Sequence, residues 1–172
     1  MDTRKFAMNY GAVLGILLVL VSYFSYIFGI DEKESMIPSI LNNGLTIGFI
    51  AYAVTKYRDI FNNGYISYSS SLKLGTTVAF FSSVILAFYT FLFISYINTD
   101  ALNDIISMTE QAMLESNPDV SDEELDLALE MTSKMMQPHW IMMMGILGGT
   151  FMGFLYSLAI SFFVKKSDNN II

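Results

Sequence analysis

Four long stretches of the chain contain no charged residue, and they limit its fold more than any other feature. A helix that crosses the roughly 30 Å hydrocarbon core of a bilayer needs about 20 predominantly apolar residues. The four stretches are 25, 20, 24 and 26 residues long, so each is long enough to span. The sequence therefore predicts four transmembrane helices, at residues 6–30, 36–55, 74–97 and 139–164.

Composition and length agree with a single membrane domain over residues 1–172. The chain is 53% hydrophobic and only 15% charged, whereas soluble domains are about 45 to 50% apolar and about 25% charged. Arg4 and Lys5 precede the first stretch, as in a signal peptide, but this stretch is too long and lacks a small-residue cleavage site. We therefore expect an all-α, polytopic membrane protein with four transmembrane helices in an antiparallel bundle.

The same composition argues against several classes of function. A net charge of −7 argues against nucleic acid as a partner, because phosphate-binding proteins concentrate positive charge. The chain has no cysteine and a single histidine, which excludes disulfides and thiolate chemistry and leaves few ligands for a metal. We therefore expect neither a cofactor nor a metal site.

Basic residues gather on alternate connections between the apolar stretches. Short cytoplasmic loops carry an excess of Lys and Arg, and seven of the nine basic residues lie at the termini and in the connection at 56–73. Thirteen of the 16 acidic residues lie in the other connections, at 31–35 and 98–137. Both termini are therefore expected in the cytoplasm. The connection at 31–35 is short enough to predict a tight hairpin between the first two spans.

The connection at 98–137 has the pattern of two amphipathic helices outside the membrane. Asn117 and Pro118 break the first helix, since the residue before a proline avoids the helical region. Ser121 and Glu124 have the spacing of a capping box that begins the second helix. We therefore expect an acidic helical hairpin. Its predicted apolar stripes are Leu102, Ile105, Ile106, Thr109 and Met113, and then Leu125, Ala128, Leu129, Thr132 and Met136.

The basic connection at 56–73 is rich in aromatic residues, which suits the level of the lipid headgroups. Asn62-Asn63-Gly64 predicts a turn within it. Ser67 is a plausible helix cap, so the third helix is expected to begin before its apolar part.

Small residues recur at every fourth position in all four predicted spans. Such stripes let helices pack closely in a bilayer. Close packing matters there because lipid tails are as apolar as the helices, so the hydrophobic effect does not favour helix association. We therefore predict that they form helix contacts, within one chain or in a homo-oligomer. The stripes are Gly11 and Gly15, then Gly44 and Gly48, then Gly75, Ala79, Ser83 and Ala87, and finally Gly145, Gly149 and Gly153.

A few polar residues lie within or beside the spans. Asn42 and Asn43 could line a small polar cavity, although such residues also bridge helices. His139 and Trp140 stand where the last span begins, and amphipathic rings are common at that level. An interfacial role is therefore expected for this pair.

Three segments of the chain resemble the short four-span membrane proteins known as domain of unknown function 4199. They are FAMNYGAVLG at residues 6–15, NGYISYSSSLKLG at 63–75 and YINTD at 96–100. The resemblance implies a bacterial protein of the cytoplasmic (inner) membrane, with no assigned activity and no known catalytic residues.

These observations favour a structural or interaction role over catalysis. We expect no enzyme, because the spans show no nucleophile with a base, no positioned carboxylate pair and no metal ligands. Besides the lipid bilayer, the expected partner is another membrane or extracytoplasmic protein, bound through residues 98–137. The alternative is a small-solute transporter or a subunit of an oligomeric pore.

Overall fold

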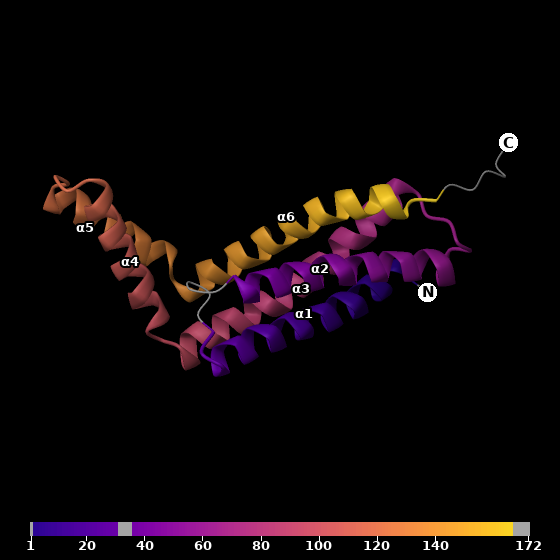
Figure 1. Cartoon of the computed structure of the whole chain (residues 1–172), viewed down its shortest axis with the longest axis horizontal. Helices are drawn as coiled ribbons and strands as arrows, with labels where there is room; N and C mark the ends of the chain where they lie inside the picture. Colours follow the sequence, from indigo (N-terminus) through magenta and orange to yellow (C-terminus); the bar gives the residue numbers. More distant parts are fainter. Residues whose placement is uncertain (1, 31–35, 167–172) are drawn as a thin grey trace. The chain divides into compact units, whose positions relative to one another are not determined.

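The structure, a computed structural model, describes residues 2–30 and 36–166, which are almost entirely helical (Figure 1). Within these residues there is no strand, and the all-α prediction is confirmed. The elements are α1(Thr3–Ile27), α2(Ile37–Lys56), η1(Tyr57–Phe61), α3(Tyr68–Leu92), η2(Phe93–Ile97), α4(Ala101–Ser116), α5(Asp122–Met135) and α6(Pro138–Val164). The predicted hairpin at 31–35 lies outside the described residues.

Four helical segments are long and apolar enough to cross a membrane, as predicted. They are Thr3–Ile27, Ile37–Phe61, Tyr68–Ile97 and Pro138–Val164. The second and third combine α2 with η1 and α3 with η2, where η1 and η2 are single π-helical turns.

Capping residues explain where two of these helices begin. In α1 the Asp2 carboxylate accepts a hydrogen bond from the Arg4 backbone amide at 2.9 Å, so the helix begins before the first uncharged stretch. In α3 the Ser67 hydroxyl accepts from the Ser70 amide at 3.2 Å, and this confirms the predicted early start. The predicted turn is also present, with Asn63 and Gly64 at positive φ.

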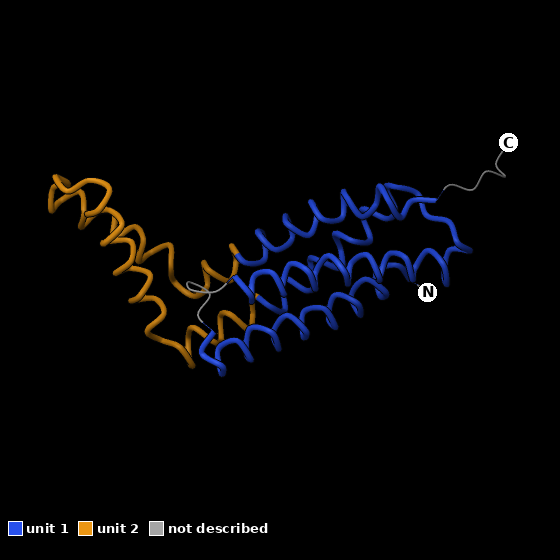
Figure 2. Tube along the Cα trace, in the orientation of Figure 1, with its two compact units in different colours: residues 1–86, 145–172 blue, residues 87–144 orange. Residues whose placement is uncertain are grey.

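The chain divides into two compact units (Figure 2). The first comprises residues 1–86 and 145–172, which hold α1, α2, most of α3 and most of α6. The second comprises residues 87–144, which hold α4 and α5 with the adjoining ends of α3 and α6.

The first unit is a helical bundle with a small core and a large apolar exterior. Leu14 of α1, Ile50 of α2 and Val78 of α3 are completely buried in this core. On α6, by contrast, Leu147 and Phe151 are more than half exposed. A soluble monomer rarely exposes so much apolar surface, whereas lipid covers it in a membrane protein.

The second unit contains the predicted helical hairpin. Ser121 and Glu124 form the reciprocal capping box at the start of α5, and Pro138 begins α6. Every residue of the two predicted stripes is half-buried, and neither α4 nor α5 has a fully buried residue. The remaining faces of both helices are exposed.

Candidate functional site

Small residues of α3 and α6 meet in a regular antiparallel register within the first unit. A Cβ added to Gly75 would lie 2.5 Å from the Ser157 Oγ, and one added to Gly153 would overlap the Ala79 Cβ. Gly149 faces Ser83 in the same way. The contacting residue therefore moves four positions forward along α3 for every four positions backward along α6. The two helices approach so closely because neither carries a large side chain on this line.

The register extends toward the ends of both helices, through residues that sequence reasoning missed. Ser71 and Ser161 fall at the next level, and both are fully buried with a side-chain hydroxyl that has no hydrogen-bond partner among the described residues. Beyond them, the backbones of Ile66 and Lys166 exchange two hydrogen bonds, at 3.0 and 2.9 Å. The sequence did contain a signal for them, because Ser71 lies four residues before Gly75, and Ser157 and Ser161 continue the four-residue spacing of Gly149 and Gly153.

The glycines of α1 pack against a different part of α3. A Cβ on Gly11 would lie 2.6 Å from the Phe81 Cβ and 2.7 Å from the Val78 carbonyl oxygen. A Cβ on Gly15 would lie 2.8 Å from the Ile85 Cβ. Helix α3 therefore has close glycine-mediated contacts with both α1 and α6.

The other predicted stripe residues lie in more varied surroundings. Within the described part of the chain, no neighbouring atom lies within 4 Å of a Cβ added to Gly44 or Gly48, so this side of α2 is open. Ala87 is buried in α3, and Gly145 is exposed on α6.

The two asparagines of α2 have different surroundings. Asn43 accepts a hydrogen bond from the Tyr156 hydroxyl at 2.6 Å and donates to the Ser39 carbonyl at 2.8 Å, so it links α2 to α6. The Oδ1 of Asn42 is buried and has no partner among the described residues. Both ends of the Asn43 side-chain amide are thus hydrogen-bonded to helix residues, the oxygen to Tyr156 of α6 and the nitrogen to Ser39 of α2.

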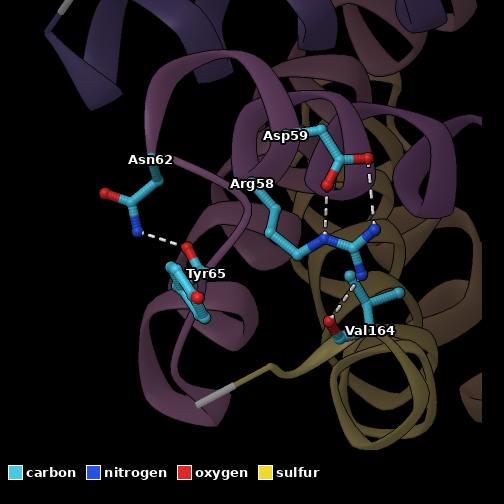
Figure 3. A network of polar contacts seen from close by, with 5 residues as sticks. All are labelled: Arg58, Asp59, Asn62, Tyr65 and Val164. Carbon is cyan, nitrogen blue, oxygen red and sulfur yellow. Dashed lines mark hydrogen bonds and ion pairs between the residues drawn. The ribbon is translucent and has the colours of Figure 1, made fainter. Parts of the chain in front are cut away.

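Charged and polar groups at one end of the first unit join the connection at 56–67 to α6 (Figure 3). Arg58 forms an ion pair with Asp59 at 2.7 Å and donates to the Val164 carbonyl at 3.0 Å. The second bond satisfies a carbonyl that the last turn of α6 leaves without an intrahelical partner. Asn62 holds the neighbouring turn by donating to the Tyr65 carbonyl. The connection is therefore fixed to the end of α6.

Aromatic rings and lysines surround this network. The Phe6 and Tyr10 rings stack with centroids 4.2 Å apart, and the Lys56 ammonium lies 5.6 Å from the Tyr10 ring and 5.2 Å from the Tyr52 ring. Lys165 lies in the same way over Phe162. Such pairs keep the charge at the membrane surface while the apolar stem stays in contact with apolar groups. The start of α1, η1, the segment before α3 and the end of α6 are joined here by the Thr3–Tyr57, Arg58–Val164 and Ile66–Lys166 hydrogen bonds. We call this end of the first unit the basic end; the basic residues of these segments and of the adjoining turns of α2 and α3 are Arg4, Lys5, Lys56, Arg58, Lys73, Lys165 and Lys166.

The first turn of α6 carries the predicted interfacial pair. His139 and Trp140 are both exposed, and their ring centroids are 5.7 Å apart. Among the described residues, no group of three or more His, Cys, Asp or Glu side chains is placed to hold a metal ion.

The surface of the α4–α5 hairpin is acidic and partly apolar. Residues 98–137 contain ten acidic residues and one lysine. That lysine, Lys134, donates a hydrogen bond to Glu130 at 2.7 Å, and this bond lowers the pKa of the Glu130 carboxyl group below its ordinary value. Leu127, Met131 and Met135 of α5 are 58%, 57% and 62% exposed, outside the stripe that faces α4. Sequence reasoning did not single out these three residues, although their four-residue spacing was readable.

A family model described as a protein of unknown function, DUF4199, matches residues 9–166. No curated protein and no solved structure matches the chain.

Proposed function

The chain belongs to the DUF4199 family, whose function is unknown, and we propose that it is a non-enzymatic membrane protein that binds a partner protein through the α4–α5 hairpin. In this proposal the bundle anchors the hairpin, and the hairpin supplies the binding surface. The basic end of the first unit lies in the cytoplasm and the hairpin lies on the outer side of the cytoplasmic membrane.

The apolar side chains that the hairpin leaves exposed are the observation that carries the proposal. Its predicted stripes are half-buried between α4 and α5, so the hairpin does not need Leu127, Met131 and Met135 for its own packing. A connector between two spans needs only a few residues, whereas this one has two helices of 16 and 14 residues. An exposed apolar stripe on such a segment is typical of a surface that a partner covers.

The charge distribution supports the proposed orientation. Seven basic residues stand at one end of the first unit, and positively charged short loops remain in the cytoplasm. The hairpin carries ten acidic residues and one basic residue. It therefore lacks the positive charge that retains a loop on the cytoplasmic side.

Site-specific photo-crosslinking in intact cells tests the proposal. A photoreactive phenylalanine analogue placed at Leu127 of the full chain should give protein adducts. The same analogue at Phe151, which is 58% exposed on α6, should give lipid adducts. An adduct of twice the chain mass would identify a second copy as the partner. Lipid adducts alone at Leu127 would contradict the proposal.

A further inference from the structure

Helix α5 carries two apolar stripes, and only one of them faces α4. The first stripe, which includes Leu125 and Leu129, is half-buried in the hairpin. The second consists of Leu127, Met131 and Met135, with side chains between 57% and 62% exposed. Residues four apart lie above one another on a helix, so these three form a continuous line, which we call the outer stripe.

Acidic side chains lie beside the Leu127 end of the outer stripe. Residues three or four positions apart are neighbours on a helix surface, which places Glu123, Glu124 and Glu130 next to Leu127. Lys134, the one lysine in residues 98–137, forms an ion pair with Glu130 at 2.7 Å. The outer stripe is therefore an apolar line with acidic side chains around its Leu127 end.

We propose that the outer stripe binds an amphipathic helical segment of a partner protein, one that carries Lys or Arg beside its apolar face. This inference rests on the proposed function and names the chemistry of the partner. Apolar side chains of the segment cover Leu127, Met131 and Met135, and its cations meet Glu123 and Glu124. Charge complementarity of this kind favours one partner over others and speeds association.

The charge of the hairpin argues against two other occupants. An anionic lipid surface would bring negative headgroups against the ten acidic residues of this segment. A second copy of the chain would bring ten more acidic residues to the same surface, and like charges oppose such a contact. A basic segment is the occupant that relieves this repulsion.

The side chains of the stripe suit an adaptable contact. Methionine is unbranched and has three rotatable bonds, so Met131 and Met135 can fit apolar surfaces of different shape. Three side chains offer a small area, and small interfaces are typical of weak, transient complexes. The expected binding is therefore weak and sensitive to salt.

Binding of defined peptides to the full chain tests the inference. The protein is placed in nanodiscs of phosphatidylcholine, and empty nanodiscs serve as the blank. One fluorescent probe is a 14-residue amphipathic helix of Leu and Lys, and the other has Glu in place of every Lys. Fluorescence anisotropy should show binding of the Lys peptide alone. This binding should weaken at least tenfold between 50 and 500 mM salt, because the Debye length falls about threefold over this range and exposed charge pairs are screened.

Two matched sets of substitutions locate the binding surface. Leu127→Gln, Met131→Gln and Met135→Gln together should weaken binding of the Lys peptide at least tenfold. Met108→Gln and Leu114→Gln, at exposed apolar positions of α4 that are 49% and 42% exposed, should leave it unchanged. Circular dichroism checks that both variants keep their helices.

Each other outcome has a distinct meaning. Equal binding of the Lys peptide by both variants would overturn the inference, and so would equal binding of the Glu peptide. Stripe-dependent binding to vesicles that contain phosphatidylglycerol would assign the stripe to lipid, and stripe-dependent dimers would assign it to a second copy. If photo-crosslinking at Leu127 still yields protein adducts, the proposed function stands although this partner chemistry is wrong.

Discussion

At the scale of single residues, the glycines of one helix differ in what surrounds them. Gly149 and Gly153 of α6 face α3 so closely that an added Cβ would overlap Ser83 or Ala79, whereas no described atom lies within 4 Å of a Cβ added to Gly148. All three lie in the same membrane-spanning helix. Their roles therefore depend on the side of α6 that each occupies.

Gly153→Ala should destabilise the bundle, and Gly148→Ala should not. The added methyl at residue 153 forces α3 and α6 apart, and overpacking of this kind costs about 1 to 3 kcal/mol. At residue 148 alanine meets open surface and is the better helix former by about 1 kcal/mol. Unfolding of the purified protein by sodium dodecyl sulfate in mixed micelles would measure both changes.

A pair of glycines in α2 gives a control for this interpretation. Gly44→Ala and Gly48→Ala should behave like Gly148→Ala, since both positions are open. Equal stability of the Gly153→Ala and Gly148→Ala variants would contradict the close α3–α6 contact.

At the scale of elements, spacing in the sequence predicted the helices better than it predicted their contacts. The stripes of α4 and α5 were foreseeable because a solvent-exposed helix has one apolar side, and that side packs. In the spans almost every side is apolar, so hydrophobicity does not indicate which side meets a neighbour. Gly44 and Gly48 repeat the spacing of Gly11 and Gly15, yet only the latter pair contacts α3.

The capping box of α5 allows a test at the same scale. Ser121→Ala removes the hydroxyl that accepts a hydrogen bond from the Glu124 amide, and the loss of such a cap costs about 1 kcal/mol. Hydrogen exchange should therefore become faster in the first turn of α5. Ser133→Ala, in the exposed part of the same helix, makes the same chemical change without a cap and should leave exchange unchanged. Equal exchange rates in the two variants would show that the box does not stabilise the helix.

At the scale of the whole molecule, the net charge of −7 conceals one basic region and one acidic region. The basic end holds seven of the nine basic residues, and residues 98–137 hold ten of the 16 acidic ones. The four spans were predictable because a bilayer sets a minimum length for an uncharged helix. The hydrogen bonds at the basic end were not predictable, because the bond from Arg58 to Val164 joins residues 106 positions apart.

The absence of cysteine from the chain makes its orientation directly measurable. Ser116→Cys places one thiol at the end of α4, and Ser69→Cys places one in the first turn of α3, near the basic end; both serines are exposed. If the basic end is cytoplasmic, a membrane-impermeant maleimide added to spheroplasts should label residue 116 and not residue 69. In inverted vesicles the pattern should reverse. Labelling of residue 69 alone in spheroplasts would place the hairpin in the cytoplasm, where an extracytoplasmic partner could not reach the outer stripe.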